Sequence, residues 1–226
     1  MNLLKAGSTI GGLTLVSRIL GFAREMIFAR VMGAGMAADA FALAFLIPNL
    51  FRRLFGEGAF SQGFVPLFAR RLDGEGGMAE AKRFAEEVQA VFLPLLLLVT
   101  IVFMIAMPAF VGIIAAGWVD DPEKFDLPVD LTAITFPYLI FISMVSLFSG
   151  ILNSLTRFTA AAFAPALLNM ALIAALLAAP PDKIEVVRYM AIAVLLTGIA
   201  QFDLCWWPVR RAGVKLSFGR PRDTHA

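Results

Sequence analysis

Long apolar runs separated by short polar links set the plan of this chain. Six of these runs are long enough to cross a lipid bilayer, whose hydrocarbon core of about 30 Å needs about 20 apolar helical residues. Because lipid offers no partner to backbone polar groups, each run should be a helix that satisfies its own hydrogen bonds. The runs lie at residues 8–31, 37–69, 84–116, 129–153, 160–179 and 186–207. The pattern predicts an all-α, polytopic membrane protein with six transmembrane helices.

Prolines and glycines indicate where these helices are interrupted. The second run contains Pro48, Pro66 and several glycines, so we expect it to bend. The fourth run should break at Pro137. Residues 210–226 are polar and basic and show no core-forming pattern. We therefore divide the chain into a transmembrane domain at 1–209 and a cytoplasmic tail or linker at 210–226.

Composition supports the membrane location and argues against several kinds of site. The chain is 60% hydrophobic and 16% charged, whereas soluble domains average about 45–50% and about 25%. The one cysteine, Cys205, lies in an apolar run, and the one histidine, His225, is the penultimate residue. No disulfide framework, metal cluster or histidine-based catalysis is expected in the body of the chain, so we predict no metal and no cofactor.

Basic residues other than Arg18, Arg24, Arg52 and Arg53 are distributed unequally between the two sides of the membrane. With the N-terminus in the cytoplasm, eleven of them lie inside and four lie outside. Those inside are Lys5, Arg70, Arg71, Lys82, Arg83, Arg157, Arg210, Arg211, Lys215, Arg220 and Arg222, and those outside are Arg30, Lys124, Lys183 and Arg188. Because Lys and Arg favour cytoplasmic links, both termini are predicted to be cytoplasmic. The basic tail is interpreted as a topology signal or a lipid-headgroup contact, with no nucleic-acid partner.

Charged residues inside the first two runs are the main candidates for function. They are Arg18, Arg24, Glu25, Asp39, Arg52, Arg53 and Glu57. A central arginine costs roughly 2.5–3.5 kcal/mol on insertion, against roughly 3–5 kcal/mol gained from all the apolar residues of the first run. Such helices are plausible only where the charges face other helices or a water-filled cavity. Charged residues within a membrane therefore indicate a functional site.

Helical spacing places these charges on one face of each helix. In the first run this face comprises Arg18, Gly21 and Glu25 at i, i+3 and i+7, with Arg24 beside them. In the second run it comprises Asn49, Arg52, Arg53 and Gly56, with Glu57 one turn beyond Arg53. Two such faces turned inward would create a positive cavity. Because guanidinium groups bind phosphate oxygens bidentately, the expected ligand is an anion carrying phosphate or carboxylate.

A structural interpretation of the same charges is also open. Ion pairs between neighbouring helical turns would fix helix packing, and other arginines would extend to an interface. The pairs concerned are Arg18 with Glu25 and Arg53 with Glu57, and the arginines near an interface are Arg24 and Arg52. Asp39 begins the second run, where it is either a helix cap or outer-mouth residue, or a ligand.

Five stretches of the sequence together form a long signature. They are Ser17–Glu25 (SRILGFARE), Gly33–Phe45 (GAGMAADAFALAF), Pro48–Pro66 (PNLFRRLFGEGAFSQGFVP), Ile134–Phe158 (ITFPYLIFISMVSLFSGILNSLTRF) and Ala162–Asn169 (AFAPALLN). The signature resembles the N-terminal region of the lipid II flippase family, MurJ, also called MviN. The resemblance covers essentially the whole chain.

The resemblance implies one six-helix lobe of a two-lobe exporter fold, in the superfamily that includes multidrug extruders and polysaccharide exporters. It implies a transporter and not an enzyme. The implied partner is undecaprenyl-pyrophosphate-linked disaccharide-pentapeptide, moved across the bacterial cytoplasmic membrane by alternating access for peptidoglycan synthesis. The chain ends about where the second lobe of the family would begin, so a missing C-terminal lobe is a further expected partner.

The resemblance also implies site residues. The cavity arginines of the family correspond to Arg18, Arg24 and Arg52, and Asp39 matches a position that the family needs. The residues Arg53, Glu25 and Glu57 lie in the same motif. A single lobe does not enclose a two-sided cavity, so transport by one lobe alone is not expected unless it pairs with another.

Three alternatives remain open. The first is a related exporter of another polyprenyl-linked saccharide or of a drug-like substrate, although drug extruders should favour acidic cavities. The second is a membrane enzyme acting on a phospholipid-like substrate, which usually needs an intramembrane histidine or an acidic pair near a metal. The third is a structural or regulatory half-protein that docks to a partner.

Overall fold

The computed structural model describes residues 3–56 and 59–214. Over these ranges the chain is helical and contains no strand, which confirms the predicted all-α class. Its helices are α1 (Leu3–Met32), α2 (Met36–Gly56), α3 (Ala59–Asp73), α4 (Gly77–Ile105), α5 (Met107–Ile114), α6 (Pro122–Thr135), α7 (Tyr138–Ser154), α8 (Thr159–Ala178) and α9 (Lys183–Arg211), with a 3-10 turn at Ala116–Trp118.

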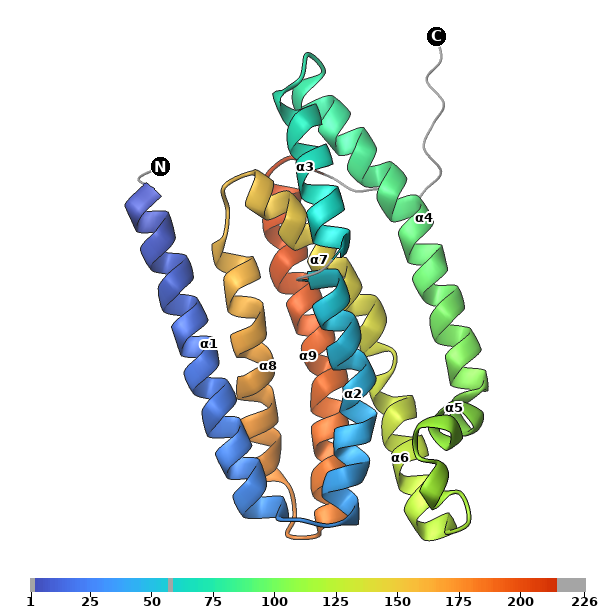
Figure 1. Cartoon of the computed structure of the whole chain (residues 1–226). Coiled ribbons are helices and arrows are strands. Elements are labelled where there is room, and N and C mark those ends of the chain that lie inside the picture. The colour runs from blue at the N-terminus through green and yellow to red at the C-terminus, as the bar shows by residue number, and fades with distance from the viewer. Residues whose placement is uncertain (1–2, 57–58, 215–226) are drawn as a thin grey trace.

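The helices run up and down between two ends of one bundle (Figure 1). The pairs α2 and α3, and α6 and α7, each continue roughly in one direction, so each pair acts as a single pass, and the short α5 lies at the lower end of α4. The links at 33–35 and 179–182 lie at one end, and those at 74–76 and 155–158 lie at the other. This alternation matches the order of apolar runs in the sequence.

Helix α7 forms the centre of the bundle. It packs against α2, α3, α4, α8 and α9, and its side chains from Ile142 to Phe148 are buried. Gly198 of α9 lies against Tyr138 at the start of α7, where an added Cβ would approach the Cδ2 atom of the ring to 2.5 Å. Since lipid chains are as apolar as the side chains, such close packing contributes strongly to helix association in a membrane.

The second run is divided into two helices, α2 and α3. Helix α2 ends at Gly56 and α3 begins at Ala59, whereas Pro48 and Pro66 both lie inside helices. The interruption therefore lies in the glycine-containing stretch between the two prolines. In the fourth run, α6 ends at Thr135 and α7 begins at Tyr138, as the position of Pro137 predicts.

Four helical stretches within the described residues are long and apolar enough to cross a membrane. They are Gly77–Ile105, Lys124–Ser154, Thr159–Ala178 and Lys183–Arg211. Helices α1 and α2 carry the arginines inside their apolar sequence. Both helices nevertheless run alongside the apolar ones in the same bundle, as expected of charges held within a protein scaffold (Figure 1).

Candidate functional site

A cavity of about 560 Å³ lies among α1, α2 and α8 and brings most of the predicted charges together. We call it the arginine pocket. Its charged and amide lining residues are Arg18, Arg24 and Glu25 from α1, Asn49 and Arg53 from α2, and Asn169 from α8. Three guanidinium groups and one carboxylate give this lining a net positive charge. The predicted positive cavity between the first two runs therefore has a physical counterpart in the fold.

Within the arginine pocket, the ion pair of Glu25 differs from the predicted one. Its Oε1 atom pairs with the Nη2 atom of the adjacent Arg24. Among the described residues, no ion pair joins Glu25 to Arg18. The Glu25 side chain is 64% exposed and that of Arg24 is 20% exposed. Exposed ion pairs contribute little to stability. The single, exposed carboxylate of Glu25 therefore does not cancel the positive charge of the three arginines, and the pocket still attracts anions.

The remaining predicted site residues have different positions. Asp39 is exposed in the first turn of α2 and does not line the arginine pocket. A carboxylate at this position interacts favourably with the positive end of the helix dipole, in agreement with a role at the helix start. Of Arg52 only the backbone within α2 is described, and Glu57 lies outside the described residues, so the suggested Arg53–Glu57 pair also falls outside them.

Asn169 is a lining residue that the sequence analysis did not single out. Its Nδ2 atom donates a hydrogen bond of 3.1 Å to the backbone carbonyl of Ser17, which joins α8 to α1. Gly21 lies beside this bond, where an added Cβ would come into ordinary van der Waals contact with Nδ2 at 3.4 Å. An amide in the otherwise apolar helix α8 indicates such a contact, because polar side chains inside membrane helices form hydrogen bonds with neighbouring helices.

One end of the arginine pocket adjoins a smaller apolar cavity of about 230 Å³. The two cavities share Arg24, Glu25, Phe45 and Asn49. Aromatic rings of Phe28, Phe41 and Phe45 dominate the smaller one, and we call it the aromatic pocket. Phe41 and Phe45 stack with a centroid distance of 5.8 Å.

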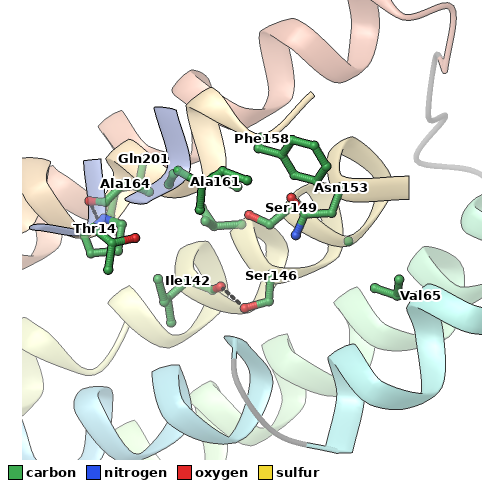
Figure 2. Close-up of a pocket in the computed structure, with 15 residues that line it drawn as sticks. Thr14, Val65, Ile142, Ser146, Ser149, Asn153, Phe158, Ala161, Ala164 and Gln201 are labelled. Carbon is green, nitrogen blue, oxygen red and sulfur yellow. Dashed lines mark hydrogen bonds between the residues drawn. The ribbon is translucent and has the colours of Figure 1, made fainter. Parts of the chain in front are cut away.

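The other end of the arginine pocket adjoins a third cavity of about 500 Å³. We call it the hydroxyl pocket, because Thr14, Ser146, Ser149 and Asn153 contribute polar side chains to its lining (Figure 2). It shares Thr14, Ala162 and Pro165 with the arginine pocket. Shared lining residues thus connect the three cavities, with the arginine pocket between the other two.

A polar network forms the wall of the hydroxyl pocket. The hydroxyl of Tyr138 donates to the Oε1 atom of Gln201 at 3.1 Å, and the Nε2 atom of Gln201 donates to the carbonyl of Ala164 at 2.6 Å. These bonds join α7, α9 and α8. Since both ends of the Gln201 amide are used, this residue fixes the helices around the cavity.

Comparisons with known proteins agree on one family. The family described as "Lipid II flippase MurJ" matches residues 28–224. A protein of Rhizobium tropici named "Probable lipid II flippase MurJ" is 48% identical over 99% of this chain and 43% of its own length. A protein of Burkholderia cenocepacia named "Lipid II flippase MurJ" is 43% identical over 89% of this chain and 39% of its own length.

The fold comparison gives the same result. A solved structure titled "Lipid II flippase MurJ, inward closed conformation" matches with a TM-score of 0.76 and 27% identity, over 93% of this chain and 43% of that one. The chain therefore spans somewhat less than half the length of the curated relatives and of the structure that it matches. The helical bundle, its intramembrane arginines and the match over residues 28–224 lead to one conclusion, that this chain belongs to the lipid II flippase MurJ family.

Proposed function

We propose that this chain forms the N-terminal lobe of a flippase for lipid-linked peptidoglycan precursor, with the arginine pocket holding the diphosphate. The observation that carries the proposal is the convergence of Arg18, Arg24 and Arg53 on one cavity inside a membrane bundle. Arginine remains charged at any physiological pH, and its planar fork matches phosphate oxygens. A diphosphate is therefore the kind of ligand that offsets the cost of three arginines in this position.

The proposed roles of the site residues follow from their positions. Arg24 is the least exposed member of its ion pair and lies where the arginine and aromatic pockets meet, so it contacts the diphosphate directly. Arg18 and Arg53 approach the same group from opposite helices. Arg52 and Glu57 are assigned to the site from the family motif alone. Asp39 supports the start of α2, and Glu25 pairs with Arg24 and reduces the positive charge of the pocket.

Transport then requires the cavity to open to each side of the membrane in turn. In transporters of this general kind, two lobes rock around a site near the middle of the bilayer. In this lobe the arginine pocket is lined by α1, α2 and α8, and the proposal requires a second lobe facing α1 and α2 to complete its enclosure. No covalent step is involved, because the ligand changes only its side of the membrane.

The proposed location is the cytoplasmic membrane of a bacterium, with both termini in the cytoplasm. The last turn of α3, with Arg70 and Arg71, lies at the same end of the bundle as the link that carries Arg157 and the end of α9 at Arg210 and Arg211. The opposite end includes the links at 33–35 and 179–182. The excess of basic residues at the first end supports this orientation.

A second candidate is export of another polyprenyl-linked saccharide. The same diphosphate would occupy the same arginines, so the pocket accommodates either substrate. A cationic drug-like substrate fits less well, because the lining of the arginine pocket is net positive.

Complementation tests the proposal. Cells depleted of their own lipid II flippase would receive this chain, alone or joined to the C-terminal lobe of a relative, with wild-type sequence or Arg24→Ala. We expect growth with the joined wild-type form and none with its Arg24→Ala variant at equal membrane levels. Normal growth of that variant would contradict the proposed role of the arginine pocket.

A further inference from the structure

The hydroxyl pocket differs in chemistry from the arginine and aromatic pockets. Ser146, Ser149 and Asn153 lie at i, i+3 and i+7 on one face of α7, and Thr14 of α1 contributes another hydroxyl (Figure 2). The residues lining this cavity include none of Asp, Glu, Lys or Arg. A neutral lining rich in hydroxyl and amide groups suits a neutral, polar ligand.

Hydrogen-bonding capacity remains available in this pocket. The Ser146 hydroxyl donates to the carbonyl of Ile142 at 3.1 Å, which leaves its lone pairs as acceptors. The Ser149 hydroxyl has a contact of 4.0 Å with the sulfur of Cys205. Within the described part of the chain, the side chains of Thr14 and Asn153 form no hydrogen bond. These two side chains therefore offer both donors and acceptors to a ligand.

An aromatic ring completes the pocket. Phe158 precedes α8 and lies beside Ser149 and Asn153, as Figure 2 shows. The tight turn before it is fixed by a hydrogen bond of 2.8 Å from the Arg157 N–H to the Leu152 carbonyl. An apolar ring beside a few convergent polar groups is the usual composition of a small-ligand site, and it matches a sugar, which has apolar C–H faces and polar edges.

The position of the hydroxyl pocket links it to the diphosphate. In a lipid-linked saccharide, the sugar is bonded directly to the diphosphate, so its subsite must adjoin the arginines. The hydroxyl pocket does so through Thr14, Ala162 and Pro165. Apart from the residues that it shares with the arginine pocket, the aromatic pocket on the other side is lined only by apolar side chains, among them Phe28 and Phe41, which offer a sugar no hydrogen bonds.

We propose that the hydroxyl pocket is the sugar subsite of the chain, in which Thr14, Ser149 and Asn153 bind hydroxyl or acetamido groups and Phe158 covers an apolar sugar face. The inference rests on the proposed function, because it assumes that the arginines hold a diphosphate-linked lipid. The volume of the hydroxyl pocket, about 500 Å³, lies within the usual range of ligand pockets, about 300–1,000 Å³.

A binding experiment separates this subsite from the diphosphate site. The full chain in lipid nanodiscs would be titrated with undecaprenyl diphosphate, with the same lipid carrying a disaccharide but no peptide, and with uncharged undecaprenol. The test variant is Ser149→Ala with Asn153→Ala, because both residues line the hydroxyl pocket and neither lines the arginine pocket. Ser154→Ala is the matched control, because its hydroxyl bonds to the Gly150 carbonyl and does not line the pocket.

The expected result is a loss of about tenfold in affinity for the sugar-bearing lipid, with affinity for undecaprenyl diphosphate unchanged within about twofold. Two lost neutral hydrogen bonds correspond to a change of this size. The Ser154→Ala control should bind both lipids as wild type does. The test variant should keep the thermal-unfolding midpoint of wild type. Equal losses for both lipids, or no loss for either, would overturn the sugar subsite while leaving the arginine pocket intact. Binding of both diphosphates no tighter than undecaprenol would instead overturn the proposed function and the subsite together.

Discussion

The hydroxyl of Thr135 in α6 donates a hydrogen bond of 2.9 Å to the backbone carbonyl of Ala44 in α2. Ala44 lies four residues before Pro48, and proline has no N–H to donate to that carbonyl. The carbonyl is buried, where an unpaired polar group is costly. Thr135 thus provides the partner that Pro48 removes, and it ties the helix that carries Asn49 and Arg53 to the core of the bundle.

Replacing Thr135 with Val should destabilise the protein by about 1–2 kcal/mol, because it leaves the Ala44 carbonyl without this partner. The side chains have nearly the same shape, so packing changes little. The thermal-unfolding midpoint in detergent should fall by several degrees, and Thr135→Ser should retain most of the wild-type value. An unchanged midpoint in Thr135→Val would show that the bond contributes nothing.

Replacing Gly198 with Ala should destabilise the contact between α7 and α9. The new Cβ would approach Tyr138 to 2.5 Å, and overpacking of this kind costs about 1–3 kcal/mol. Gly11→Ala is the matched control, because nothing lies within 4 Å of its added Cβ. The same thermal measurement should show a lower midpoint for Gly198→Ala only. Equal midpoints for the two variants would contradict the close packing.

Some elements of the fold can be predicted from the sequence, and others cannot. Apolar runs and Pro137 predicted the order of the helices, because membrane helices depend mainly on local composition. The break between α2 and α3 was attributed to prolines as well as glycines, yet Pro48 is accommodated within a helix by Thr135, a residue 91 positions away from Ala44. A partner so distant is set by tertiary packing, which local pattern does not encode.

The candidate site shows the same division. Helical periodicity placed Arg18 and Glu25 on one face of α1, and both line the arginine pocket. Periodicity did not predict that Glu25 pairs with its neighbour Arg24, because side chains of adjacent residues usually diverge on a helix. It also did not indicate Asn169, whose role depends on α8 packing against α1.

Arg24→Lys should retain part of the function that Arg24→Ala loses. Lysine keeps the positive charge but not the planar fork that binds two phosphate oxygens at once. We expect partial growth in the complementation assay described above, measured at equal membrane levels of both variants. Full growth with Arg24→Lys would mean that charge alone is sufficient at this position.

Glu25→Gln should strengthen diphosphate binding modestly, by up to about fivefold. The change removes the carboxylate that lines the arginine pocket, and because this side chain is 64% exposed its effect should be small and reduced by salt. Titration with undecaprenyl diphosphate at low and high ionic strength measures both features. Weaker binding would show that Glu25 acts mainly by positioning Arg24.

Direct binding of the diphosphate is the decisive measurement for the arginine pocket. The full chain in nanodiscs would be titrated with undecaprenyl diphosphate and with undecaprenol, in wild type and in Arg24→Ala. We expect wild type to prefer the diphosphate by at least about tenfold, and Arg24→Ala to lose most of this preference while remaining folded. Equal affinity of wild type for the two lipids would show that the arginine pocket does not hold the diphosphate.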